Sequence, residues 1–173
     1  MKPKHVAPFH VLSKNTAMLD VSPLIEAYAN GPEQLRDAVS STPKYGWDEK
    51  PVEGKWSIRQ VVCHLADSEI VYVDRMKRVI AEDNPTFFEA DPDVFGPALH
   101  CKHRPWETEL NMIEAVRSHM LPILKASDIQ DFQRTGVHSL DGPMNLETLL
   151  ERITGHIPHH IAFIREKLDA MRK

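Results

Sequence analysis

Apolar residues recur every three to four positions along most of the chain, whereas runs in which apolar and polar residues alternate are hard to find. The first spacing is typical of amphipathic α-helices, and strict alternation would indicate half-buried strands. Sequences that favour tight turns between paired strands are also scarce. The pattern therefore predicts an all-α protein.

The first of four helical segments is expected at about residues 22–40. Ser22 is a residue type that caps helix starts, and Pro23 would occupy the first helical position, where its missing amide hydrogen costs nothing. In the middle of this segment, Gly31 and Pro32 together predict a break or a kink.

The second and fourth segments begin with clearer signals. Ser57 precedes the second, and Gln60 stands three residues later, so the pair can form a capping box at the start of a helix that extends to about Glu82. Asn145 can cap the fourth, which carries a continuous apolar stripe as far as Leu168.

The third helical segment is expected at about residues 106–125, and a long stretch, residues 84–105, connects it to the second. That stretch predicts an irregular crossover of a length that is often functional. It contains four prolines: Pro85, Pro92, Pro97 and Pro105.

Four amphipathic helices predict a four-helix bundle, in which metal and ligand sites are built from side chains on facing helices. A chain of 173 residues is long enough for one such domain without any disulfide or structural metal. We expect the bundle to occupy residues 21–173 and residues 1–20 to form an N-terminal extension.

Composition narrows the classes of partner. The net charge is -4 and no run of Lys or Arg marks a phosphate-binding face, which argues against nucleic acid. No segment approaches the roughly 20 apolar residues of a membrane span or the apolar core of a signal peptide. Cys63 and Cys101 lack the spacing of a disulfide framework. We therefore expect a cytoplasmic protein.

Histidines supply the candidate chemistry. His156 and His160 stand four residues apart in the fourth segment, so a helix would place both imidazoles on one face at the edge of the apolar stripe. His159 would lie on the opposite, solvent-facing side. In the second segment, His64 also falls at the boundary between the apolar and polar arcs. Three boundary histidines can face a shared cleft.

The spacing alone does not make these histidines ligands, because a pair four residues apart is more often surface or core residues than a metal site. Three neutral imidazoles would leave coordination positions open, as catalytic zinc sites do. Pro158 disfavours helix between His156 and His160, and it represents either a tolerated kink on the polar side or a local conflict that marks a site.

The segment Gly54-Lys55-Trp56-Ser57-Ile58-Arg59-Gln60-Val61-Val62-Cys63-His64-Leu65-Ala66-Asp67-Ser68-Glu69 is followed some ninety residues later by His156-x-x-x-His160. In this combination the chain resembles the DinB-like superfamily, especially its YfiT-like branch, over about residues 23–168. The resemblance implies a metal-binding four-helix bundle.

The resemblance also implies that His64, His156 and His160 hold one divalent metal ion, commonly zinc or nickel. Its functional implication is broader. Members include metal-dependent hydrolases and transferases that join a low-molecular-weight thiol to an electrophile, and shared fold does not decide between them. We expect an enzyme that activates water or such a thiol against a small electrophilic substrate.

Other residues near the histidines carry weaker expectations. Asp67, one turn beyond His64, could orient a ligand imidazole or accept a proton, although an exposed surface carboxylate is the commoner role. His138 could approach the site from the stretch before the last helix. Cys63 projects about 100° away from His64, so we expect a packed thiol there.

Two rival functions remain open at this level. The first is a metal-binding or ligand-binding bundle without turnover, such as a stress-response protein. The second is a structural dimer that pairs through an exposed apolar helix face, since bundles of this kind can form homodimers. Both keep the predicted fold and remove the reaction.

Overall fold

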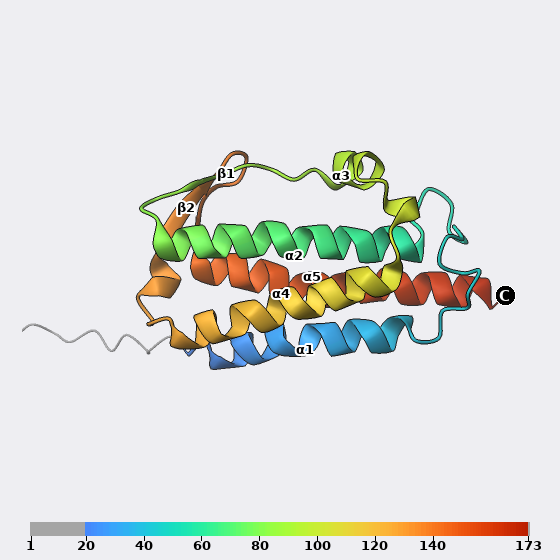
Figure 1. Cartoon of the computed structure of the whole chain (residues 1–173), viewed down its shortest axis with the longest axis horizontal. Coiled ribbons are helices and arrows are strands. Elements are labelled where there is room, and N and C mark those ends of the chain that lie inside the picture. The colour runs from blue at the N-terminus through green and yellow to red at the C-terminus, as the bar shows by residue number, and fades with distance from the viewer. Residues whose placement is uncertain (1–19, 173) are drawn as a thin grey trace, which may run out of the picture.

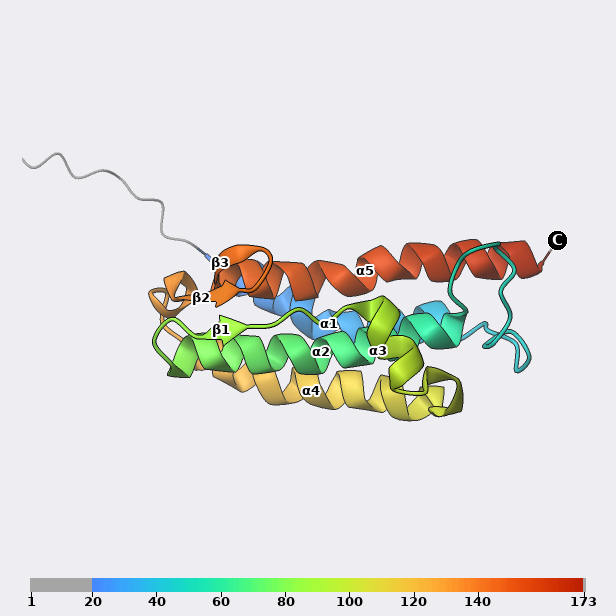
Figure 2. The same ribbon diagram turned by 90° about the horizontal axis from the view of Figure 1, so that it is seen from above.

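The computed structural model describes residues 20–172 as four long helices packed side by side, with a small sheet and a short helix along one flank (Figures 1 and 2). The long helices are α1 (Ser22–Val39), α2 (Ile58–Ala81), α4 (Trp106–Ala126) and α5 (Leu146–Met171). The four-helix bundle is confirmed. Apart from Asp20, the predicted N-terminal extension lies outside the described residues.

Each long helix packs against two others. Helix α1 contacts α4 and α5, and α2 also contacts α4 and α5. Helices α1 and α2, which are the first two long helices in the chain, therefore lie diagonally across the bundle. This arrangement places α2 directly beside α5, the two helices that carry the candidate metal ligands.

Two helix starts follow the sequence signals closely. Ser57 Oγ accepts the amide hydrogen of Gln60 at 3.2 Å, and Gln60 Oε1 accepts that of Ser57 at 2.9 Å, which completes the capping box of α2. Asn145 Oδ1 accepts the amide hydrogen of Thr148 at 2.8 Å and caps α5. These caps fix where the two helices that carry the candidate histidines begin.

The start of α1 differs from the prediction, and no break interrupts its middle. Ser22 is the first helical residue rather than the cap, and its amide donates to Asp20 Oδ1 at 3.0 Å. The helix also continues through Gly31 and Pro32, both of which are buried. Packing against α4 and α5 therefore outweighs the local tendency of these residues to interrupt a helix.

The expectation of no strands was wrong for three short segments. Strands β2 (Thr135–His138) and β3 (Gly142–Asn145) form an antiparallel hairpin, and β1 (Thr86–Phe87) pairs in parallel with β2. Gly142 has a φ of +76°, a backbone conformation that glycine adopts readily at the hairpin turn. Strands of two to four residues are too short to show alternation in a sequence.

The crossover between α2 and α4 is also more regular than predicted. After β1 it forms helix α3 (Pro92–Ala98) and the short 3₁₀ helix η1 (Cys101–His103), and a second 3₁₀ helix, η2 (Asp131–Gln133), follows α4. Asp91 caps α3 by accepting the amide hydrogen of Asp93 at 2.9 Å. In Figure 2 the crossover runs along α2, so it covers one side of that helix.

The buried apolar residues form two clusters, one toward each end of the bundle. The first includes Tyr28, Met76, Phe132 and Leu149, and the second includes Leu35, Leu65, Ile113 and Ile161. Glu69 on α2 and Arg117 on α4 fall between the contributions of their helices to these clusters. The bundle therefore has a buried polar pair in its middle.

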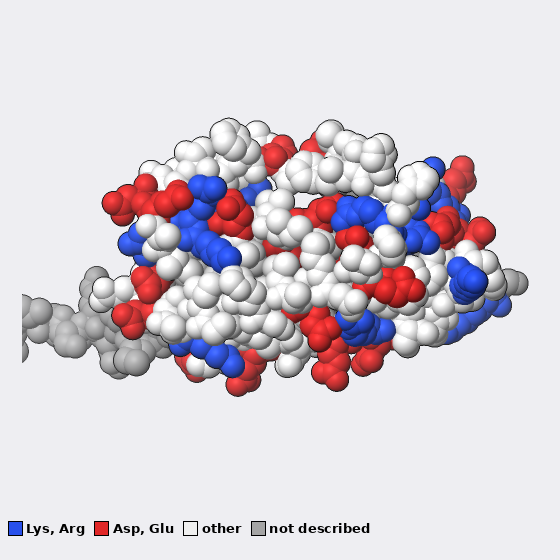
Figure 3. All heavy atoms as spheres, in the orientation of Figure 1, with Lys and Arg blue, Asp and Glu red and all other residues white. Residues whose placement is uncertain are grey.

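The surface carries both signs of charge interspersed, and two largely uncharged areas, over β1 and over α3, have acidic atoms between them in the view of Figure 3. None of the described helices is long and apolar enough to cross a membrane.

Candidate metal centre

His64 lies in the second turn of α2, close to the capping box that begins the helix. Its neighbours Val61 and Leu65 are buried in the bundle core, which holds the helix in one rotational position. The imidazole itself is half-buried, and the ring of Trp56 packs edge-on against it with centroids 5.2 Å apart. The sequence prediction of a boundary position is confirmed.

Helix α5 supplies the other two imidazoles. His160 is 8% exposed and His156 is half-buried, while His159 and Pro158 are exposed on the opposite side. The buried residues Ile157 and Ile161 fix this orientation by packing in the core. Helix α5 runs on through Pro158, so the proline does not separate the two histidines.

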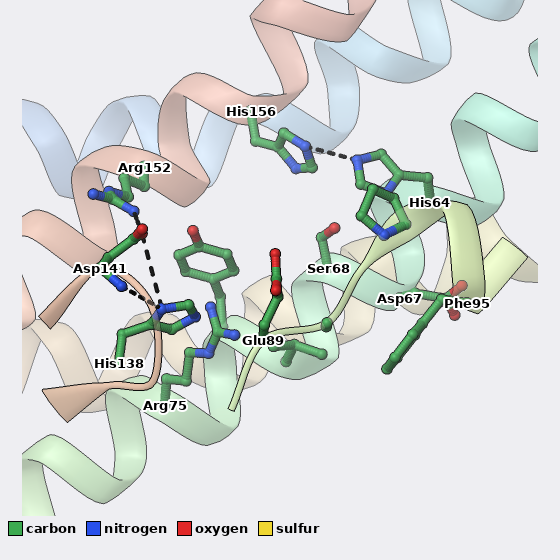
Figure 4. A pocket seen from close by; sticks show the side chains of 14 residues that line it. His64, Asp67, Ser68, Arg75, Glu89, Phe95, His138, Asp141, Arg152 and His156 are labelled. Atoms are coloured by element: carbon green, nitrogen blue, oxygen red, sulfur yellow. Dashed lines mark hydrogen bonds and ion pairs between the residues drawn. The ribbon is translucent and has the colours of Figure 1, made fainter. Parts of the chain in front are cut away.

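The three imidazoles converge. His156 Nε2 lies 3.0 Å from His64 Nε2 and 3.1 Å from His160 Nε2, and one nitrogen from each ring lies within 4.8 Å of the others. Figure 4 shows the rings of His64 and His156 facing each other across the gap between α2 and α5. The structure therefore brings together the three histidines that the sequence singled out.

Burial keeps these imidazoles neutral. Desolvation is the largest cause of the lowered pKa values of His156 and His160, both about 3, and the neighbouring histidines lower them further. Desolvation also lowers the pKa of His64, although the charge of Asp67 opposes it. Neutral imidazoles offer their lone pairs at ordinary pH, as metal binding requires.

The donor set fits a small divalent ion. Metal–nitrogen bonds of about 2.0–2.1 Å in tetrahedral geometry hold two nitrogens about 3.3 Å apart, close to the separations of His156 from its two neighbours. The Nε2 atoms are the ones that converge, so they are the nitrogens that can bind the ion, while the buried Nδ1 atoms of His156 and His160 have no hydrogen-bond partner among residues 20–172.

A cavity of about 230 Å³ opens beside the centre, between α2, α5, the crossover and the β2–β3 hairpin (Figure 4). His64 and His156 form part of its wall. The other lining residues are Asp67, Ser68, Val71, Tyr72, Arg75, Glu89, Ala90, Pro92, Phe95, His138, Asp141 and Arg152. A small molecule in this cavity would lie next to the imidazoles.

Asp67 lines this cavity, but its carboxylate is engaged elsewhere. Arg104 donates to both of its oxygens at 2.9 Å, and the same guanidinium also binds Glu109. Asp67 is therefore held in place beside His64 without a hydrogen bond to it among the described residues. Its role in proton transfer stays a prediction.

Two polar side chains that line the cavity were not predicted as site residues from the sequence: Glu89 was not considered, and His138 was only a candidate. Glu89 comes from the crossover and points into the cavity in Figure 4, and it forms no ion pair among residues 20–172. His138, a candidate from the stretch before the last helix, is buried in the cavity wall. Only the folded path of the crossover and hairpin brings them there.

Comparison with known proteins identifies the family. The model of the DinB superfamily matches residues 27–164, most of the described chain. The chain belongs to the DinB superfamily.

Relatives within the superfamily carry metal-related names. Two proteins of Oceanobacillus iheyensis, each named a putative metal-dependent hydrolase, are 26% identical over 147 residues and 29% identical over 133 residues. These alignments cover 84% and 77% of this chain, and 82% and 77% of the two relatives.

A solved structure shows the same fold. The structure of YfiT from Bacillus subtilis, described as a probable metal-dependent hydrolase with an unusual four-helix bundle topology, superposes with a TM-score of 0.82. It is 26% identical in sequence, and the match covers 96% of this chain and 93% of that one.

Cys63 follows its prediction as a packed residue of this DinB-superfamily bundle. Its side chain is 1% exposed, and its thiol lies 3.6 Å from the carbonyl oxygen of Cys101. Burial raises the pKa of the Cys63 thiol to about 12. Among the described residues, the cluster that could hold a metal ion contains the three histidines without Cys63.

Proposed function

We propose that this DinB-superfamily protein is a metal-dependent hydrolase of a small electrophilic substrate, with His64, His156 and His160 as the metal ligands. One observation carries the proposal: three neutral imidazoles from two helices converge, and two of them, His64 and His156, line a cavity. A structural metal site would have no need of an adjoining cavity, and it would usually have four protein ligands.

Because the three candidate ligands are neutral, they favour a catalytic metal site over one that only binds the metal. His64, His156 and His160 would hold a divalent ion without neutralising its charge, and such an ion would lower the pKa of a bound water toward about 7. Imidazole ligands suit zinc and nickel alike, so we propose one divalent transition metal ion of this kind. The three histidines would bind the metal ion, and the shape and lining of the cavity determine which molecule can reach that site.

Glu89 is the residue best placed to move a proton in this cavity. Its carboxylate points inward and has no guanidinium or ammonium partner in the described chain, so it can accept a proton from the attacking group. Asp67, by contrast, has both oxygens occupied by Arg104. Tyr72 and Phe95 add apolar surface that limits water around the substrate.

The test begins with metal content. Protein purified without a histidine tag or chelator should contain about one equivalent of a transition metal by elemental analysis, and His64→Ala should lose it while keeping its helical circular dichroism. His119→Ala is the matched control, because His119 is an exposed histidine on α4. Metal-free wild type that cannot be reconstituted would overturn the proposal.

Turnover is then measured on a panel of small esters, amides and epoxides, with and without low-molecular-weight thiols. Metal-dependent release of the hydrolysis product, lost in His64→Ala, supports a hydrolase. Product formed only with a thiol would replace the hydrolase by a thiol transferase that uses the same histidines. Stoichiometric metal without turnover on any substrate would favour a non-catalytic binding protein.

A further inference from the structure

Two arginines are buried in the described part of the chain, and they differ in their partners. Arg117 is 1% exposed and pairs with the carboxylate of Glu69. Arg75 is 6% exposed, yet no carboxylate lies within ion-pair distance of its guanidinium among residues 20–172. Because a buried charge without a counter-charge is costly, such a group needs a further explanation.

Arg75 is held so that its guanidinium meets the cavity. Its Nη2 donates to the carbonyl oxygen of Phe88 at 2.6 Å, and the guanidinium carbon lies 5.1 Å from the centre of the Tyr72 ring. These two contacts fix the plane of the group and leave donors over, because a guanidinium has five N–H bonds. Arg75 also lines the same cavity as His64 and His156.

His138 provides a second donor beside Arg75. Its Nδ1 accepts the amide hydrogens of Leu140 at 3.3 Å and Asp141 at 3.2 Å, so the proton of the neutral ring must sit on Nε2. The side chain is 7% exposed, and its Nε2 has no partner among the described residues. In Figure 4 the ring lies next to Arg75, at the end of the cavity away from His64.

The other charged groups in this region are accounted for. Asp141 binds the guanidinium of Arg152 and lies 3.9 Å from His138 Nδ1, so these two residues largely cancel each other's charge. Of the other two carboxylates of the wall, Asp67 is bound by Arg104, and Glu89 forms no ion pair with Arg75. The donors of Arg75 and His138 are thus left for a ligand.

We propose that Arg75 and His138 form a carboxylate-binding subsite, so that the substrate is an organic acid anion whose reactive bond lies toward the three histidines. This assignment of a substrate class rests on the proposed function. A guanidinium recognises a carboxylate through two parallel hydrogen bonds, and an imidazole N–H can donate a third.

The placement also sets the shape of the ligand. His64 and Arg75 are eleven residues apart on α2, which corresponds to about 16 Å along the helix axis. Residues Ser68, Val71 and Tyr72 line the cavity between them. The ligand should therefore be elongated, with its acid group at one end, an apolar middle and its electrophilic bond at the other end.

The test measures binding to metal-free protein, so that it does not depend on turnover or on a metal ion. Isothermal titration calorimetry would compare phenylalkanoates, from phenylacetate to 6-phenylhexanoate, each with its uncharged primary amide. We expect at least one acid to bind about tenfold more tightly than its amide. Equal binding of acid and amide throughout the series would overturn the subsite.

Variants of Arg75 test whether this residue causes the preference for the acid over its amide. Arg75→Gln should remove the preference for the acid, and Arg75→Lys should keep part of it because the charge remains. Arg78→Gln is the matched control, since Arg78 lies one turn further on α2, is exposed and pairs with Asp74 and Glu82. An acid preference that persists in folded Arg75→Gln, or disappears in Arg78→Gln, would overturn the assignment.

The subsite and the proposed function fail in distinguishable ways. Acid-selective binding without metal uptake or turnover would leave the subsite standing and remove the hydrolase. Metal-dependent turnover of neutral substrates only, with no preference for acids in the binding series, would do the reverse.

Discussion

Arg117 donates a hydrogen bond of 2.7 Å to the carbonyl oxygen of Tyr28, the oxygen that Pro32 leaves without its usual helical partner. The neighbouring Gly31 makes this contact possible, because a Cβ atom at that position would collide with the Arg117 guanidinium. The same guanidinium binds Glu69 and the carbonyl oxygen of Ile153. One side chain therefore connects α1, α2, α4 and α5.

Arg117→Met should destabilise the fold strongly. The substitution leaves the carboxylate of Glu69 buried without its partner, which typically costs about 3–5 kcal/mol in the free energy of unfolding. Urea denaturation of the metal-free protein measures it. Arg36→Met is the control, because the Arg36–Glu114 pair is exposed and should contribute less than about 1 kcal/mol. Similar losses in both variants would contradict this account.

Gly31→Ala and Gly155→Ala should change stability in opposite directions. The added methyl group at position 31 meets the Arg117 guanidinium and should cost about 1–3 kcal/mol. At Gly155, an exposed position within α5, a Cβ atom has no neighbour within 4 Å, so alanine should stabilise the helix by about 0.5–1 kcal/mol. Thermal unfolding of the metal-free variants compares them. Stabilisation by Gly31→Ala would show that the guanidinium moves aside freely.

The metal-free protein should lose stability in acid. Burial lowers the pKa values of His156 and His160 to about 3, below the value of about 6.5 in an unfolded chain. The unfolded state therefore binds protons first as the pH falls. Stability is fully present above about pH 6.5 and decreases toward pH 3, by up to about 1.4 kcal/mol per pH unit for each histidine.

Urea denaturation at pH 7, 6 and 5 checks this slope. The double variant His156→Gln, His160→Gln should show a flatter dependence on pH over the same range, because the substituted amides do not titrate. An identical slope in wild type and double variant would mean that other groups control the acid response.

Cys63→Ala should leave the metal content unchanged. The thiol packs against the backbone of Cys101, and its pKa of about 12 keeps it protonated at neutral pH. Native wild type should accordingly react slowly with a thiol reagent at pH 8, and reaction should become fast after denaturation. A loss of metal in Cys63→Ala at unchanged fold would make this cysteine a fourth ligand.

Glu89→Gln should lower kcat by about 10²–10⁴-fold and leave metal content intact, if Glu89 accepts the proton in the proposed reaction. Asp67→Asn provides the contrast, because Asp67 is bound on both oxygens by Arg104 and should affect stability more than turnover. Kinetics on whichever substrate the panel identifies would measure both variants. A large loss of kcat in Asp67→Asn alone would reverse the two roles.

The parts of the fold that were predictable depend on local chemistry. Ser57 with Gln60, and Asn145 with Thr148, cap their helices through residues within three positions, and these caps fix where the two helices begin. The ligand cluster followed because His64, His156 and His160 each lie at an apolar boundary, which is a property of one helix at a time. The family resemblance then predicted that the three histidines share one site.

The parts that were not predictable depend on contacts between distant segments. Pro32 suggested a break because Arg117, which donates to the Tyr28 carbonyl oxygen that the proline leaves free, lies 85 positions after the proline in the chain. Strand β1 has two residues, and it is a strand only because β2 lies beside it. Glu89 and Arg75 carried no spacing signal, since the cavity that they share forms when the crossover folds back along α2.

His64 and His156 are 92 positions apart in the chain, and only the assembled bundle brings their nitrogens to 3.0 Å. A chain in which α5 has formed but has not docked on α2 would keep the pair His156 and His160 and lack the third nitrogen. Metal uptake would then report tertiary assembly rather than helix content. Titration with a divalent ion would thus count the correctly folded molecules in a preparation, including those that circular dichroism cannot tell from a loosely packed state.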